Sequence, residues 1–225
     1  EYVALGPAGI EMLPRLPAMF AATHAVFATA HIVNPASGAV DGAVARMAAR
    51  VIHEASRIED GFGNLRFAAL ANVLPGTPFF PAAYHGGGAP AFAVATEAAD
   101  LAVAVGQAAD LAEAHLRLRQ AIEAEAARIV QVAERLAAAH GVRFGGIDFS
   151  LAPFPTPECS IGAALEGLTG QPLGAAGTLA AAATLADAIG QARFPHIGFC
   201  GLMLPVLEDA VLAQRAAEGR LHVGE

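Results

Sequence analysis

The chain has 225 residues, enough for one large domain or two small ones around a contiguous core. Its residues are 55% hydrophobic and only 15% charged, against a usual charged share of about 25%. This composition indicates extensive burial and predicts a homo-oligomer, because few charges are available to cover an isolated surface. The formal net charge of -8 and the lack of a basic cluster argue against nucleic acid and anionic membranes as partners.

All thirteen basic residues are arginine. The absence of lysine excludes a Schiff-base lysine, and with it the usual pyridoxal phosphate (PLP) chemistry, and also a P-loop lysine. The two cysteines, Cys159 and Cys200, have no CxxC spacing, so a reduced, cytoplasmic protein is expected. No apolar run is long enough for a membrane span. The opening residues EYVALGPAG lack the basic start of a signal peptide and resemble a strand entered in mid-fold, which predicts a fragment of a longer protein.

Runs typical of strands and of helices alternate along the chain. Strands are predicted at 2–5, 24–33, 65–73, 91–96, 143–151 and 196–204. Helices are predicted at 8–22, 40–58, 97–105, 109–139, 160–168, 177–190 and 206–218. Pro14 and Pro17 should bend or shorten the first helix.

This alternation predicts an α/β fold of mostly parallel strands enclosed by helices, as a single domain over 1–225. The pattern is compatible with an open doubly wound sheet and with a closed barrel. Nothing in the sequence repeats, and no low-complexity linker divides it.

Polar side chains follow three of the predicted strands, where parallel α/β folds bind their ligands. They are Tyr84 and His85 after the third strand, Asp148 and Ser150 at the fifth, and Glu208 and Asp209 after the sixth. Because the carboxyl ends of parallel strands share one edge, we expect these groups to converge on a site.

Each candidate also has a structural interpretation. Glu208 and Asp209 open a helix, where the helix dipole favours acidic residues as caps. Asp148 interrupts an apolar strand and is either a site residue or a buried carboxylate paired with an arginine, for which Arg66 is the natural partner. His85 suits a general base or a metal ligand, although most single histidines are neither. Cys200 is expected to be a small buried hydrophobe.

The glycine patterns do not support a nucleotide site. GFGN at 61–64 is too short for GxGxxG and precedes a strand, so no dinucleotide is expected. Gly177 and Thr178 open an alanine-rich helix and could face an anion, but Thr178 as an ordinary N-cap is the simpler interpretation.

Four segments, DGFGNLRFAALANVLPGTPFFPAAYH, GIDFSLAPFP, GTLAAAATLADAI and GLMLPVLEDAVLAQRAAEG, carry a resemblance to a known family. Together, and in this order, they resemble the signature blocks of a bacterial and archaeal family catalogued as domain of unknown function 711, or uncharacterised protein family 0210. Members of that family are roughly twice as long as this chain, so the resemblance implies that part of any active site lies outside it.

The resemblance also implies a fold similar to the ten-stranded α/β barrel of pyruvate formate-lyase-like proteins. Fold likeness does not confer chemistry, and no glycyl radical loop is recognisable here, so no glycyl radical is expected. Genes of the family often stand beside one for a small ACT-domain protein, which makes such a protein an expected partner.

The favoured hypothesis is a cytoplasmic enzyme that acts on a small polar metabolite. His85 or Asp148 would be the general base, with Tyr84 and Ser150 as further catalytic groups. Three residues of the segment 61–85 would bind the substrate, with the arginine holding a carboxylate or phosphate: Asn64, Arg66 and Asn72. Glu208 and Asp209 would hold a divalent cation. The alternatives are a non-catalytic regulatory subunit that binds a small ligand, and a scaffold with an internal salt-bridge network.

Overall fold

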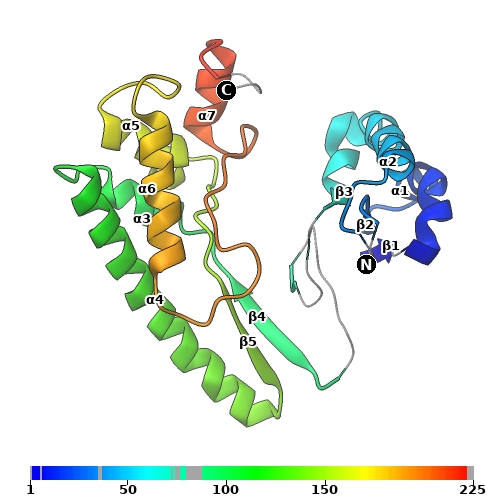
Figure 1. Ribbon diagram of the computed structural model, residues 1–225, viewed down its shortest axis with the longest axis horizontal. Coiled ribbons are helices and arrows are strands. Elements are labelled where there is room, and N and C mark those ends of the chain that lie inside the picture. Colours follow the sequence, from blue (N-terminus) through cyan, green and yellow to red (C-terminus); the bar gives the residue numbers. More distant parts are fainter. Residues whose placement is uncertain are drawn as a thin grey trace. The chain divides into compact units, whose positions relative to one another are not determined.

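A computed structural model describes residues 2–5, 7–34, 37–71, 73, 77–79 and 88–221. The chain divides into two compact units, Glu1–Gly88 and Ala89–Glu225 (Figure 1). Each unit has its own hydrophobic core. The expectation of one domain over 1–225 stays a prediction, and the units are described separately.

The first unit is built on a parallel sheet of three strands in the order β1-β2-β3. The strands are β1 (Tyr2–Leu5), β2 (Phe27–His31) and β3 (Phe67–Leu70). The helices of this unit are the 3₁₀ helix η1 (Pro7–Arg15), α1 (Leu16–Ala22), α2 (Gly42–Ala55) and the 3₁₀ helix η2 (Glu59–Arg66). Its core includes Leu13, Leu16, Phe20, Ala28, Val51 and Phe67.

Two local features of the first unit follow from its sequence. The predicted helix 8–22 is divided into η1 and α1, with Pro14 inside η1 and another proline in the first turn of α1. Proline has no N–H to donate, so it interrupts the helical ladder but is tolerated in a first turn. The carboxylate of Asp41 caps α2 by accepting from the backbone N–H groups of Ala43 and Val44.

The predicted strand 65–73 is shorter in the structure, because η2 occupies the residues before Phe67. Glu59, Asp60 and Gly61 have positive φ, which the extended backbone does not allow. Gly63 packs so closely on the carbonyl oxygen of Ala55 that a Cβ would collide with it. The segment that contains Arg66 is therefore a tight helical turn rather than a strand.

The second unit contains the parallel pair β4 (Ala91–Ala95) and β5 (Arg143–Asp148). Beyond β5, residues 196–202 contribute only isolated bridges, His196 to Ile147 and Leu202 to Leu151. The predicted regular strand 196–204 is wrong, because Gly198 and Cys200 have positive φ and break the extended backbone.

The helices of the second unit supply most of its core. They are α3 (Ala99–Val105), α4 (Leu111–His140), the 3₁₀ helix η3 (Pro157–Cys159), α5 (Ile161–Thr169), α6 (Thr178–Gln191) and α7 (Ala210–Ala217). Figure 1 shows α6 lying along the long helix α4. The core includes Leu118, Ile122, Ile147, Phe149, Leu165 and Leu185.

Both ends of α4 follow from its sequence. Asp110 caps its first turn, and Gly141 ends it with a left-handed φ of 62°.

The structure confirms the α/β class, because helices and strands alternate and the neighbouring named strands pair in parallel. Among the described residues, the strands form one sheet of three and one of two, and no barrel closes. In the part of the chain that the structure describes, no helix is both long and apolar enough to cross a membrane.

Candidate functional site at the carboxyl end of strand β5

Asp148 and Ser150 lie where the sequence predicts a site, at the carboxyl end of β5, and both side chains are buried. The Ser150 hydroxyl donates to Asp148 Oδ1 at 2.6 Å. Asp148 Oδ1 also accepts from the backbone N–H of Cys200, and Oδ2 from that of Phe199, each at 2.8 Å. The carboxylate thus joins the end of β5 to the loop 198–201, and charge-assisted bonds of this kind are the stronger ones in proteins.

The loop that Asp148 holds has an unusual backbone. Gly198 has a φ of 79°, and a Cβ there would collide with the Asp148 carboxylate. Cys200 has a φ of 47°, which is uncommon for a residue with a side chain. Strained residues of this kind persist only where the surroundings hold them, and they gather at functional sites.

Thr96 connects the end of β4 to the same cluster. Its Oγ1 donates to the Ser150 carbonyl oxygen at 3.2 Å and accepts from the Ser150 backbone N–H at 3.1 Å. Two parallel strands and one strained loop therefore meet at Asp148, Ser150 and Thr96. Because both Asp148 oxygens already accept hydrogen bonds, this carboxylate is arranged to orient its neighbours.

Cys200 is half-buried, and its thiol lies 3.3 Å from the Ile197 carbonyl oxygen and 3.4 Å from that of Ile147. Burial raises the pKa of the Cys200 thiol, and the negative charge of Asp148 adds to this effect, while its backbone hydrogen bonds oppose it. The thiol is therefore a protonated donor at neutral pH, and Cys200 is a half-buried hydrogen-bond donor rather than the fully buried small hydrophobe that the sequence predicts.

Asp209 adopts the capping role that the sequence offers as an alternative. Its Oδ1 accepts from the backbone N–H groups of Val211 and Leu212, so it caps α7. Oδ1 also accepts from the Ser160 hydroxyl at 2.6 Å, and Oδ2 from the Ile161 N–H at 2.6 Å. One buried carboxylate thus serves the amino ends of α5 and α7.

A cation role for Glu208 and Asp209 stays a prediction. Glu208 is exposed, and the described part of the chain contains no group of three or more His, Cys, Asp or Glu side chains that could hold a metal ion.

Arg66 belongs to the first unit, where it is buried at the end of α1. Its two terminal nitrogens donate to the carbonyl oxygens of Thr23 and Phe20, each at 2.5 Å, and its guanidinium lies 5.1 Å from the centre of the Phe20 ring. Arg66 and Asp148 each have other partners within their own units, and the expected pair between them stays a prediction. Among the described residues, Arg66 Nε and Asn64 Oδ1 are buried without a hydrogen-bond partner.

Three other predicted site residues lie outside the described residues: Asn72, Tyr84 and His85. Their proposed roles stay predictions.

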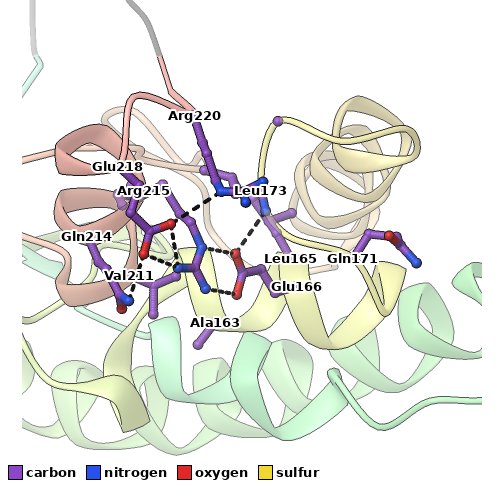
Figure 2. Close-up of polar contacts among 12 residues, drawn as sticks. Ala163, Leu165, Glu166, Gln171, Leu173, Val211, Gln214, Arg215, Glu218 and Arg220 are labelled. Carbon is purple, nitrogen blue, oxygen red and sulfur yellow. Dashed lines mark hydrogen bonds and ion pairs between the residues drawn. The ribbon is translucent and has the colours of Figure 1, made fainter.

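Sequence reasoning missed a polar network between α5 and α7, which Figure 2 shows. Glu166 accepts two hydrogen bonds from the Arg215 guanidinium, at 2.6 and 2.9 Å, and one from the Leu173 N–H at 2.8 Å. Arg215 also donates to both oxygens of Glu218, and Arg220 forms an ion pair with the same carboxylate. Every charge of this network has an opposite partner within it.

The network shifts the titration of its members. The hydrogen bonds from Arg215 lower the pKa of Glu166 despite the opposing effect of burial, and the bonds to Glu166 raise the pKa of Arg215. Only the Arg215–Glu218 spacing of three residues could have been seen in the sequence, because Glu166 lies 49 residues from Arg215. The closed pairing indicates a structural role.

Comparison with known proteins places the chain in a family. The model of the family described as Uncharacterised ACR (DUF711) matches residues 3–225. A UPF0210 protein of Methanopyrus kandleri is 33% identical over 216 residues, which are 92% of this chain and 48% of the relative. One of Desulforudis audaxviator is 32% identical over 222 residues, 94% of this chain and 49% of the relative.

A third UPF0210 protein, of Pyrobaculum arsenaticum, is 36% identical over 165 residues, 69% of this chain and 37% of the relative. The chain thus spans about half the length of the curated relatives it matches, or less. The descriptions of these relatives name no reaction. With a family model that covers nearly its whole length, the chain belongs to the DUF711 family.

Proposed function

We propose that the chain supplies the strand-end part of a small-metabolite site in a cytoplasmic enzyme. The observation that carries the proposal is the loop 198–201, which a buried carboxylate holds in a strained conformation at the carboxyl end of a parallel strand. This end of the sheet is where open and closed parallel α/β folds bind ligands.

The energetics of the loop support this interpretation. A residue such as Cys200 in the left-handed region costs about 1–3 kcal/mol, which a purely structural loop could avoid with glycine at that position. The loop also exposes the ring of Phe199, 59% accessible, directly beside the backbone that Asp148 fixes. A rigid backbone next to an exposed aromatic ring is suited to position a small ligand.

The proposal gives Asp148 and Ser150 a positioning role. Both Asp148 oxygens accept from the loop or from Ser150, so proton abstraction by Asp148 would break the contacts that shape the site. His85 is then the better general base of the two that the sequence offers. We extend the proposal to a barrel of the pyruvate formate-lyase-like kind in an oligomer, supported by the parallel pairing of the named strands and by the length of the relatives.

The test is to incubate the protein with a mixture of carboxylated, phosphorylated and amino metabolites and to follow each by mass spectrometry. We expect the wild type to deplete one metabolite, and the Phe199→Ala variant to lose most of this turnover while its circular dichroism is unchanged. The matched control is Phe154→Ala, because Phe154 is a similarly exposed phenylalanine outside the loop. Turnover that survives Phe199→Ala and Asp148→Asn alike would place the chemistry elsewhere.

A scaffold is the second candidate, favoured by the complete pairing of Glu166, Arg215 and Glu218. It predicts that no metabolite is depleted and that none raises the melting temperature. Under this alternative Asp148→Asn lowers stability and has no other effect, whereas the enzyme proposal requires ligand-dependent stabilisation.

A further inference from the structure

A second candidate binding site lies in the second unit, where α4 meets residues 193–195. It is an open pocket of about 320 Å³, at the small end of the range typical of ligand sites. It shares no residue with the cluster around Asp148, so an inference from it does not depend on the proposed function.

The floor of the pocket is apolar and fixed. Ala126 is fully buried beneath it, and Val130 and Phe194 are partly buried on its walls. The Phe194 ring stacks on His196 with centroids 3.7 Å apart and makes a tilted contact with Phe149 at 5.7 Å. A wall held from two sides is preformed, which lowers the entropic cost of binding.

The rim of the pocket carries charges of both signs. The Glu123 carboxylate accepts from the Arg193 backbone N–H at 3.1 Å, so it is engaged in holding the loop. Glu134 and Arg193 line the same pocket and are both exposed, and neither side chain has a hydrogen-bond or ion-pair partner among the described residues. One negative and one positive group thus stand unpaired around an apolar floor.

From this arrangement we propose that the pocket binds a free α-amino acid with an apolar side chain. The carboxylate of the ligand would pair with Arg193, its ammonium group with Glu134, and its side chain would rest on Val130 and Phe194. A simple carboxylic acid or a simple amine would satisfy only one of the two charges, so the zwitterion is the class that matches the rim.

The first experiment measures binding to the protein by ligand-observed NMR titration with L-valine, L-leucine and L-phenylalanine as probes. Two analogues of leucine dissect the charges: 3-methylbutylamine lacks the carboxylate, and 4-methylpentanoate lacks the amine. We expect saturable binding of at least one amino acid and a loss of about fivefold in affinity for each analogue, the size of one exposed ion pair.

Variants then locate the site. Arg193→Gln should lower the affinity for the amino acid by about fivefold and leave that for 3-methylbutylamine unchanged. Glu134→Gln should also lower the affinity for the amino acid by about fivefold, and leave that for 4-methylpentanoate unchanged. Ala127→Leu fills the pocket from an exposed helical position and should abolish binding. The control for Arg193→Gln is Arg135→Gln, the same charge change at a residue of α4 that does not line the pocket.

Two results would overturn the proposal. One is the absence of saturable binding for all three amino acids up to about 20 mM, a limit weaker than any useful affinity. The other is binding that Arg193→Gln, Glu134→Gln and Ala127→Leu leave as strong as in the wild type, because the ligand would then sit elsewhere.

Discussion

Replacing Asp209 by asparagine tests whether one carboxylate holds two helices. Oδ1 accepts from Ser160 and α7, and Oδ2 accepts from Ile161 and Gly162 of α5. An amide has one oxygen, so in either orientation its NH₂ faces backbone donors of one helix. Two hydrogen bonds to a charged acceptor are lost, at about 1.5 kcal/mol each, which predicts a loss of about 3 kcal/mol in the free energy of unfolding.

Urea unfolding followed by circular dichroism measures this loss, and Asp110→Asn is the matched control. Asp110 caps α4 through one hydrogen bond, from the Glu113 N–H, and is exposed. Asparagine caps as well as aspartate, so this variant should stay within about 0.5 kcal/mol of the wild type. If Asp209→Asn is equally mild, the two-helix role of the carboxylate is refuted.

Three further changes test other contacts. The folded-state pKa of Glu166 is lowered, so its pairing with Arg215 contributes its full stabilisation above the ordinary pKa of glutamate. That stabilisation is lost as the pH falls through the lower folded-state pKa. In Glu166→Gln, the free energy of unfolding should therefore depend less on pH in that range. Gly198→Ala should cost about 3 kcal/mol in urea unfolding through strain and collision, whereas Gly190→Ala, in a helix with open space around it, should stabilise by about 0.5–1 kcal/mol. Arg66→Met should lower the unfolding free energy by about 2 kcal/mol, because it removes two bonds to carbonyl oxygens at the end of α1; an unchanged midpoint would mean that these carbonyls are satisfied by water.

Hydrophobic periodicity and breaker residues were sufficient to predict most elements of the fold. The long helix at 111–140 was recognised within two residues, because its apolar positions recur by threes and fours and a glycine follows it. The prediction of a strand at 196–204 fails because of a contact between distant parts of the chain. The apolar composition of this segment is compatible with a strand, but the conformation of Cys200 depends on the hydrogen bond that its backbone N–H donates to Asp148, which is 52 residues away.

The candidate site was predictable only in part. Asp148 and Ser150 stand out in the sequence because burying a polar group in an apolar strand costs free energy unless the group is hydrogen-bonded. The structure brings the two side chains together at the end of a strand. Thr96 gave no such signal, since a threonine at the end of a strand is ordinary. The choice between a cap and a metal ligand for Asp209 depends on Ser160 and α5, which no pattern in the sequence links to it.

The shared cap at Asp209 ties together parts of the chain that are made at different times. The amide donor of Ile161 lies 48 residues before its acceptor, so α5 emerges from the ribosome capped only by Ser160 and gains its second cap after residue 209 has followed. Until then the backbone N–H groups of Ile161 and Gly162 can donate only to water. A protease cut before residue 209 should likewise loosen a helix far upstream of the cut, and amide exchange in the first turns of α5 and α7 should rise together.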